Sequence, residues 1–355
     1  MEPWLADGFG NASSLHREGR RAKNAVDQAR EILTGALGVL FAEVLFTGSG
    51  TEAANLAVIG AALANQDARR SRVLVSAVEH HCVLNTRPML ERLGYRVDLI
   101  PVDREARVRM DALEDLLGDD VLLVSVMHAN NEFGTLQPVC EVAALARRFG
   151  ALFHSDAVQA LPMLACGQRP LPDLVTFSAH KIGGPKGVGA IYILAGVKLK
   201  PLVVGGGQER EMRAGTENVA GIVGFGAAVG ALSERSSPAP ARDAFLDVLA
   251  DVPGWTPSVS RAESLPGHAH GRFPGIHAEP MLIRLDRMGL AAGSGAACSS
   301  GSLEPSHVML AAGYSGEEVR EGLRFTFGPE TTIEDAHRAA SFVAEAAAAV
   351  SGIRS

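Results

Sequence analysis

Lys181 is the residue whose position points most directly to chemistry. It closes the sequence Ser178-Ala179-His180-Lys181, immediately after an apolar run that is typical of a buried strand. A lysine at the end of a buried strand is costly to desolvate unless it is paired or its pKa is lowered. Covalent bonding of the amine to a carbonyl group is the natural use for such a lysine. We therefore expect Lys181 to lie in a catalytic site.

A carboxylate, Asp156, closes another apolar run, and Gln159 follows three residues later. A carboxylate in this place commonly caps the next helix. It can also hold the protonated nitrogen of a heteroaromatic cofactor. The chain between Asp156 and Lys181 is long enough for one strand and its loop, so both side chains can reach the same edge of a sheet.

The segment Thr47–Glu52, Thr-Gly-Ser-Gly-Thr-Glu, opens a helical pattern. Free backbone N–H groups and hydroxyls at such a place form a pocket for an anion. The same residues also fit an ordinary helix-capping turn, and at this point both interpretations stay open.

His80 and His81 follow the apolar run Val73–Ser76. Adjacent residues of a regular element point in different directions, so we do not expect both to ligate one metal ion. An imidazole stacked on a flat cofactor is the more economical interpretation. His81 and Lys186 are given no catalytic role.

Cys298 stands in the Gly- and Ser-rich stretch Gly293–Ser302. Such a stretch is typical of a loop that moves, which would let a thiolate carry a group from one place to another. An unperturbed thiol has a pKa of about 8.5, so a base such as a histidine must assist it at neutral pH. The alternative for Cys298 is a small buried side chain, which is the interpretation that we give to Cys82, Cys140 and Cys166.

Alternating strands and helices would position these residues. Apolar runs predict strands at Glu43–Phe46, Val73–Ser76, Val97–Ile100, Val121–Val126, Leu152–Ser155, Leu174–Ser178 and Gly187–Ile193. Helical spacing lies between them at Thr51–Ala64, Val83–Leu93, Asp111–Leu117 and Val139–Phe149. The pattern predicts an α/β fold with a doubly wound, mostly parallel sheet. In such sheets ligands lie at the carboxyl ends of the strands, where the residues above fall.

A Ser- and Pro-rich stretch at Ser236–Pro240 is the best candidate for a domain boundary. We therefore expect a large domain over residues 1–235 and a smaller C-terminal α+β domain over 236–355 that carries the Cys298 loop. The apolar stretch Val219–Leu232 is shorter than the roughly 20 residues of a membrane helix and is predicted to be a buried helix.

Composition excludes several classes of protein. The 33 Lys and Arg against 40 Asp and Glu give a net charge of −7, which argues against nucleic-acid binding through a basic face. Hydrophobic residues make up 47% of the chain, as in an ordinary globular core. The four cysteines are too few for a disulfide framework and form no C-x-x-C pair, so we expect a cytoplasmic protein without an intrinsic metal site. The first residues show no signal peptide, and no membrane association is expected.

Several motifs together resemble the cysteine desulfurases, which are pyridoxal 5'-phosphate (PLP) enzymes of fold type I in class V of the aminotransferases. The resemblance spans nearly the whole chain, and its specificity exceeds that of any one motif. The matching segments, in the family's order, are Phe9–His16, Phe46–Leu56, Met127–Gly134, His154–Gln159, Ser178–Gly187, Met212–Asn218, Gly295–Ser306 and Leu323–Phe325.

The resemblance implies how the cofactor ring is held. Lys181 would form the Schiff base with PLP, and Asp156 would keep the pyridine nitrogen protonated. Gln159 would bind the phenolic oxygen of the ring. His80 would stack on the ring and act as an acid or base, with Asn131 also near it.

It also implies how the phosphate is bound. The residues that would form its cradle are Gly50, Thr51, Ser178 and His180. Thr216 would reach the phosphate of the other subunit's cofactor, which implies a homodimer.

The implied substrate is L-cysteine. Asn131 and Arg324 would hold its carboxylate, and Cys298 would attack its sulfur. The product sulfur would pass to an iron–sulfur scaffold or to another acceptor protein, as in tRNA thiolation or cofactor synthesis. Cys298 could contact an iron–sulfur cluster transiently on such a scaffold; no direct contact with nucleic acid is expected.

Members of this family usually have a strand ahead of the motif at Phe9, and only eight residues precede it here. Two explanations remain open: the start codon is misassigned, or the protein has a truncated N-terminal segment and lacks part of its small domain and substrate entrance. Two other functions remain as alternatives: a related class V aminotransferase or selenocysteine lyase, and an impaired member that only binds scaffold proteins.

Overall fold

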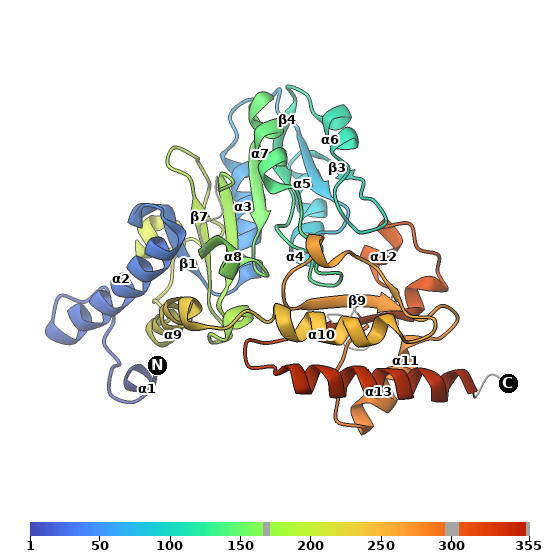
Figure 1. The fold of residues 1–355 in the computed structure, drawn as a ribbon. Helices are drawn as coiled ribbons and strands as arrows, with labels where there is room; N and C mark the ends of the chain where they lie inside the picture. The colour runs from blue at the N-terminus through green and yellow to red at the C-terminus, as the bar shows by residue number, and fades with distance from the viewer. Residues whose placement is uncertain (166–170, 295–304, 353–355) are drawn as a thin grey trace. The chain divides into compact units, whose positions relative to one another are not determined.

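The computed structural model describes residues 1–165, 171–294 and 305–352. The chain separates into two compact units, each described by itself below (Figure 1). The first contains Met1–Ile100, Met110–His128 and Pro138–Glu234, and the second contains Pro101–Arg109, Ala129–Gln137 and Arg235–Ser355.

Two short segments therefore differ from the domains expected from the sequence. The segments 101–109 and 129–137 fall within the predicted large domain, but they belong to the second unit. The reason is long-range pairing, because Thr135 forms a bridge with Ser264 and Arg107 forms an ion pair with Glu263.

A seven-stranded sheet forms the middle of the first unit, in the order β1-β7-β6-β5-β4-β2-β3. Neighbouring strands are parallel from β3 to β6, whereas β7 is antiparallel to both β1 and β6. The α/β fold with a mostly parallel sheet is confirmed. The strands are β1 (Val44–Thr47), β2 (Arg72–Ser76), β3 (Arg96–Ile100), β4 (Val121–Ser125), β5 (Leu152–Asp156), β6 (Leu174–Ser178) and β7 (Gly189–Ile193).

Helices of the first unit mostly match the periodic segments. The exception is Val83–Leu93, which is two helices rather than one, because Pro88 is tolerated only in the first turn of a helix and so begins a new one. The helices are α1 (Glu2–Leu5), α2 (Arg17–Leu37), α3 (Gly50–Ala64), α4 (His81–Leu84), α5 (Arg87–Arg92), α6 (Met110–Leu116), α7 (Val139–Arg148), α8 (Leu161–Ala165) and α9 (Val219–Gly230).

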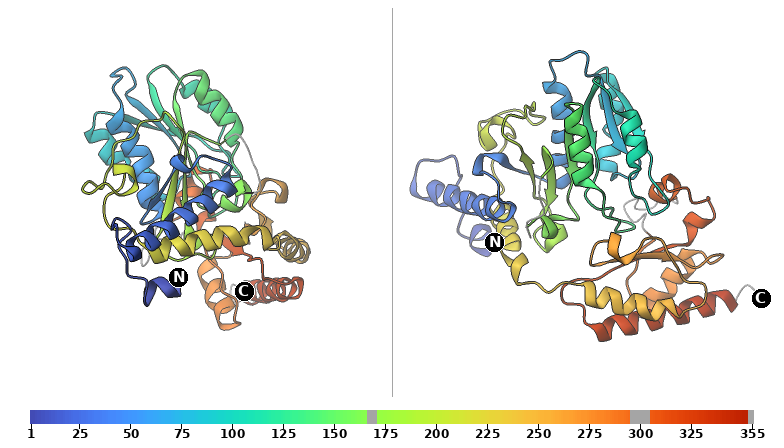
Figure 2. Two further views of the ribbon diagram at one scale, coloured as in Figure 1. Left: turned by 90° about the vertical axis from the view of Figure 1, so that its left-hand side faces the viewer. Right: turned by 45° about the horizontal axis from the view of Figure 1, so that its top comes forward.

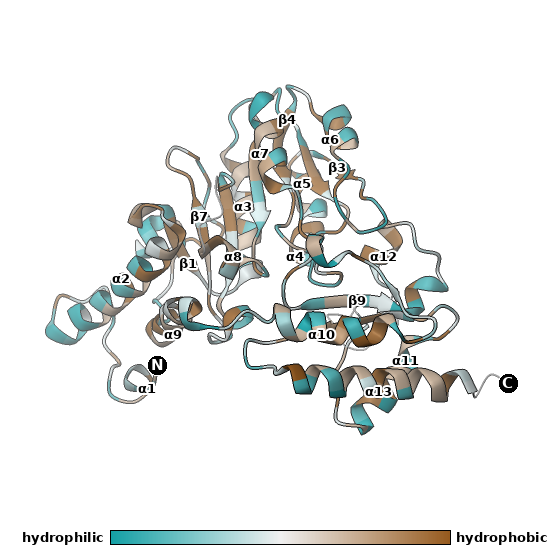
Figure 3. Cartoon of the chain, in the orientation of Figure 1, coloured by the Kyte–Doolittle hydropathy of each residue, from teal (hydrophilic) through white to brown (hydrophobic). Residues whose placement is uncertain are grey.

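Apolar strands covered by helices make up the core of this unit (Figure 3). Every residue of β4 is buried, as expected for a strand with both faces covered. The helix α3 packs against β6 and β7 through small residues such as Ala53 and Ala57. The helices α2 and α9 lie side by side (Figure 2), and a Cβ at Gly226 would lie only 2.9 Å from Cα of Ala29.

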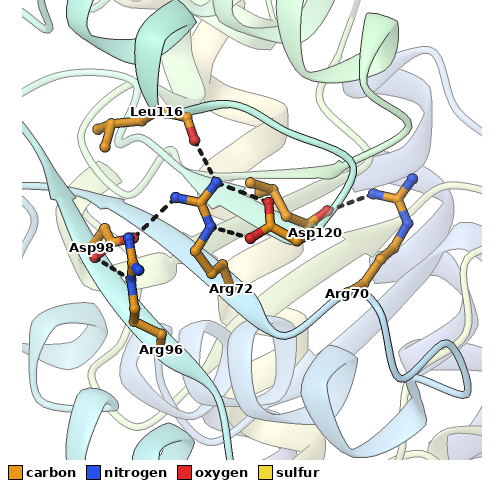
Figure 4. Close-up of polar contacts among 7 residues, drawn as sticks. Arg70, Arg72, Arg96, Asp98, Leu116 and Asp120 are labelled. Carbon is orange, nitrogen blue, oxygen red and sulfur yellow. Dashed lines mark hydrogen bonds and ion pairs between the residues drawn. The ribbon is translucent and has the colours of Figure 1, made fainter.

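Charged residues connect the amino ends of three strands (Figure 4). Arg72 begins β2, Arg96 begins β3, and Asp120 directly precedes β4. Arg72 Nε lies 2.6 Å from Asp120 Oδ2 and its Nη1 lies 3.2 Å from Asp98 Oδ2, while Arg96 also binds Asp98. We call Arg72, Arg96, Asp98 and Asp120 the amino-end cluster. It lies toward the amino ends of these strands, away from their carboxyl ends.

The second unit contains a three-stranded antiparallel sheet in the order β10-β9-β8. Its helices α10 and α13 pack on each other around Phe245, Leu249 and Val343. Among the described residues, no helix is long and apolar enough to cross a membrane. The elements are β8 (Thr256–Pro257), β9 (His268–Arg272), β10 (Gly322–Thr326), α10 (Ala239–Ala250), α11 (Ala278–Arg287), α12 (His307–Ala311) and α13 (Ile333–Gly352).

Candidate active site

The first residue of β7 brings the Thr47–Glu52 turn and the lysine motif together. Gly189 pairs with Thr47, the last residue of β1, and with Ser178, the last residue of β6. A Cβ at Gly50 would lie 3.2 Å from Cβ of Ser178 and 3.0 Å from Cγ2 of Val158. The two motifs therefore lie against each other at one edge of the sheet.

The turn itself begins α3. Ser49 caps this helix, and its hydroxyl accepts a hydrogen bond from the backbone N–H of Glu52 at 3.1 Å. Gly50 is buried and Thr51 is exposed at the first turn. Unpaired N–H groups at the start of a helix favour an anion, so the site meets the physical requirement for phosphate.

Asp156, the last residue of β5, is buried. Its Oδ1 accepts a hydrogen bond from the backbone N–H of Val158 at 2.9 Å, which closes a local turn rather than capping α8. Burial raises the pKa of Asp156 to about 6. The hydrogen bond from Val158 and the positive charge of Lys181 act in the other direction and favour the ionised form. A positively charged group beside Asp156 would therefore stabilise its ionised carboxylate.

Lys181 lies in the 3-10 turn η2 (Ala179–Ile182) that follows β6, and it is exposed. The premise that this lysine is buried is therefore wrong, since the strand ends at Ser178 and the turn carries Lys181 outward. Ser178 is buried, and its hydroxyl lies 2.8 Å from Nδ1 of the exposed His180.

His80 caps α4, and its Nδ1 accepts a hydrogen bond from the backbone N–H of Cys82 at 3.1 Å. The Cys82 thiol in turn points to Asp156, with Sγ 3.8 Å from Oδ2. Asn55 of α3 donates to the carbonyls of Thr51 and Cys82 and so connects α3 with α4. Cys82 thus contacts both His80 and Asp156.

Two groups in this region were not recognised from the sequence. Cys82, which we interpreted as a packing residue, contacts the candidate catalytic carboxylate, and burial together with Asp156 and Glu79 raises the pKa of its thiol. Glu79 is fully buried and accepts a hydrogen bond from the backbone N–H of Met127. Burial first, and the charge of Asp156 second, raise the pKa of Glu79. The signal available in the sequence was an acidic residue directly before His80 at a strand end.

Gln159 is half-buried, and Thr216 is exposed on the segment before α9. The roles expected for these two residues stay predictions.

The second unit contains the residues expected to hold the substrate carboxylate. Arg324 of β10 donates from Nη1 to the backbone carbonyl of Asn131 at 3.0 Å. Arg324 also pairs through its backbone with Gly293. Cys298 lies outside the described residues, as does Cys166.

The residues of the first unit fit PLP. The close approach of Gly50 to Ser178 leaves bare backbone and a hydroxyl for the phosphate. Asp156 offers a buried carboxylate for the pyridine nitrogen, and the charge of Lys181 already acts on it.

Comparisons with known proteins identify the family of the chain. The model of the class V aminotransferase family matches residues 1–338. The chain is 42% identical to the cysteine desulfurase IscS of Dictyoglomus turgidum over 342 residues, which cover 94% of this chain and 86% of that protein. It is 40% identical to the IscS of Methanosarcina thermophila over 351 residues, covering 97% of this chain and 87% of the relative.

Solved structures are similar as well. A NifS-like protein matches with a TM-score of 0.87 and 31% identity, over 98% of this chain and 94% of its own. SspA in complex with cysteine matches with a TM-score of 0.80 and 30% identity, over 93% of this chain and 94% of its own. The chain belongs to the class V aminotransferase family, among its PLP-dependent cysteine desulfurases.

Proposed function

We propose that the chain converts L-cysteine to L-alanine and passes the sulfur through Cys298 to an acceptor thiol. The observation that carries this proposal is Asp156, a buried carboxylate on which the charge of Lys181 acts, beside a turn suited to phosphate. The likeness to SspA, whose structure holds cysteine, supports the choice of substrate.

In this proposal the first unit binds the cofactor. Gly50, Thr51, Ser178 and His180 hold the phosphate, Gln159 binds the phenolic oxygen, and His80 covers the ring. When bound, PLP supplies an electron sink that stabilises negative charge at the α carbon of the substrate. Asp156 holds a proton on the pyridine nitrogen, and Lys181 anchors the cofactor and moves the proton at the α carbon.

Sulfur transfer requires a nucleophile from the chain. The Cys298 thiolate attacks the sulfur of the bound cysteine, and a new S–S bond forms as the C–S bond breaks. The electron pair of the broken bond stays with the carbon, which takes up a proton to give alanine. Asn131 and Arg324 hold the substrate carboxylate during this step, as their mutual contact in the second unit supports.

The proposal also includes the oligomeric state of the protein and the acceptor of its sulfur. The chain acts as a homodimer in which Thr216 reaches the partner's cofactor, and its persulfide goes to an iron–sulfur scaffold or to a protein that thiolates tRNA. Cytoplasmic residence follows from the need to keep Cys298 reduced.

The test is to incubate the purified protein with L-cysteine and a thiol and to count alanine and sulfide. Equal amounts of the two are expected, with one added sulfur atom on the peptide of Cys298 by mass spectrometry. Cys298→Ser should bind PLP but release no sulfur, and Cys140→Ser serves as the control with activity retained. Alanine production by Cys298→Ser at the wild-type rate would exclude this mechanism. Turnover of selenocysteine alone, or transamination without sulfide, would favour the other members of the class.

A further inference from the structure

An arginine–glutamate pair anchors the segment that precedes Thr216. Glu209, in the 3-10 turn η3 (Gln208–Glu211), binds Arg30 of α2 through two contacts of 2.7 and 2.8 Å. The two side chains are only 4% and 5% exposed. Glu209 also accepts a hydrogen bond from the backbone N–H of Phe46 in β1 at 3.1 Å. The segment is thus fixed to the edge of the sheet.

A second ion pair connects the same segment to the Thr47–Glu52 turn. Arg213 donates from Nε to Oε1 of Glu52 at 2.8 Å and from Nη2 to Oε2 at 3.3 Å. Glu52 Oε2 also accepts the backbone N–H of Gly48 at 2.8 Å. One carboxylate therefore binds both the turn and the distant arginine, which is 161 residues away in the chain.

The pair lies directly over the turn. A Cβ at Gly48 would lie 2.8 Å from Oε2 of Glu52 and 3.2 Å from Nη2 of Arg213. A side chain at this position would have to push the ends of the Glu52 and Arg213 side chains aside, so the ion pair covers the turn closely at Gly48.

The charges of Glu52 and Arg213 bear on phosphate binding. A carboxylate beside a phosphate site repels the phosphate unless a cation compensates it, and the repulsion is stronger where water is partly excluded. Glu52 and Arg213 are only 24% and 26% exposed, so solvent screens them incompletely. Arg213 supplies the compensating charge with the planar, two-point geometry that a lysine lacks.

We propose that Glu52 and Arg213 are positioning residues for the cofactor phosphate. Glu52 fixes the Gly48–Thr51 turn through the N–H of Gly48, and Arg213 cancels the charge that Glu52 brings to this place. The inference rests on the proposed function, in which Gly50 and Thr51 bind the phosphate of PLP.

The experiment compares PLP with pyridoxal, which lacks the phosphate. Dissociation constants are measured for the wild type, Arg213→Gln, Glu52→Gln and the double variant. Arg213→Gln should weaken PLP binding by about tenfold or more, since it leaves a charge uncompensated, and should leave pyridoxal binding unchanged. The double variant should bind PLP better than Arg213→Gln, because the repelling charge is gone.

Two results would overturn the inference. One is an equal loss of PLP affinity in Arg213→Gln and in the double variant, which would mean that Arg213 touches the phosphate or only supports the fold. The other is an equal loss of PLP and pyridoxal affinity. A wild type that binds both compounds equally well would instead contradict the phosphate site of the proposed function, and the inference would fail with it.

A matched control comes from the amino-end cluster. Asp120→Asn removes an ion pair to Arg72 at the far ends of the strands. It should lower the unfolding temperature without changing the ratio of PLP to pyridoxal affinity. A changed ratio in Asp120→Asn would show that general destabilisation alone moves this readout, and would contradict the specific role of Glu52 and Arg213.

Discussion

Asp156 and Lys181 have opposite surroundings although they lie at the ends of neighbouring strands, Asp156 as the last residue of β5 and Lys181 in the turn after β6. Asp156 is buried, and burial raises the pKa of its carboxyl group to about 6, whereas Lys181 is exposed. A buried carboxylate is stable as an anion when a positive group lies beside it. Binding of a protonated pyridine ring and ionisation of Asp156 therefore support each other.

The raised pKa of Asp156 predicts how the stability of the cofactor-free protein depends on pH. The folded state binds the proton more tightly than the unfolded state, so stability falls as pH rises from about 4 to about 6. At about 1.4 kcal/mol per pH unit, this loss is of order 3 kcal/mol. Denaturant unfolding of the cofactor-free Asp156→Asn variant should lack this contribution, whereas the contribution of Glu79, whose pKa burial also raises, remains. Parallel pH profiles for the variant and the wild type would contradict the assignment.

Asp156→Asn should also slow turnover. An amide cannot hold the pyridine nitrogen protonated, and several kcal/mol of stabilisation are lost, which is on the order of 100-fold or more in rate. PLP should still bind through its phosphate, so cofactor content is measured beside kcat. Wild-type kcat with cofactor loaded would mean that Asp156 only closes its local turn.

At the scale of elements, the site depends on the start of β7. This strand is antiparallel to β1 and β6, so its first residue lies between the last residues of both. A Cβ at Gly189 would lie 2.5 Å from the carbonyl carbon of Ser49 and 2.7 Å from the nitrogen of Gly50. Those are backbone atoms, which cannot move aside as a flexible side chain can.

Gly189→Ala should therefore displace the Thr47–Glu52 turn, which is proposed to bind the phosphate. We expect a loss of stability of about 1–3 kcal/mol, as for other overpacked positions, and a loss of PLP affinity. The matched control is Gly35→Ala in α2, where the added Cβ meets no atom within 4 Å apart from the neighbouring backbone of its own helix. That change should stabilise the protein by about 0.5–1 kcal/mol. Thermal unfolding measures the stability of the two variants, and PLP content measures their cofactor binding. An unchanged PLP content in Gly189→Ala would contradict the argument.

The sequence predicts these elements well but not how distant residues pair. Apolar runs locate all seven strands within about two residues, because burial on both faces leaves a clear signal in every strand except β3, which is partly exposed. The direction of β7 does not appear in its own residues; it follows from the short connection after β6. Likewise, the contact of Cys82 with Asp156 and the pairing of Glu52 with Arg213 depend on tertiary structure.

At the scale of the molecule, the expected tasks are divided between the two units. The proposed cofactor residues Asp156 and Lys181 come from the first unit, whereas the proposed substrate residues Asn131 and Arg324 come from the second. Asn131 belongs to the second unit although it follows β4 of the first. The chain therefore passes into the second unit at 129–137, and this short segment carries one of the two residues proposed to bind the substrate.

Arg324→Lys should separate these tasks. A lysine cannot form the two-point contact with a carboxylate, so KM for L-cysteine should rise roughly tenfold to 100-fold. PLP content should stay at the wild-type level. Arg284→Lys on α11, in an exposed ion pair with Glu345, is the matched control with KM unchanged. A lowered PLP content with unchanged KM in Arg324→Lys would mean that Arg324 serves the cofactor.

The surroundings of Cys82 also bear on what happens to the product. Sulfane sulfur moves between proteins by attack of a thiolate, and a thiol that stays protonated takes no part in such exchange. Burial and two neighbouring carboxylates raise the pKa of Cys82 and keep it protonated. An enzyme that makes persulfides can thus keep a cysteine beside the aspartate proposed to bind its cofactor without that cysteine diverting the sulfur from its delivery route.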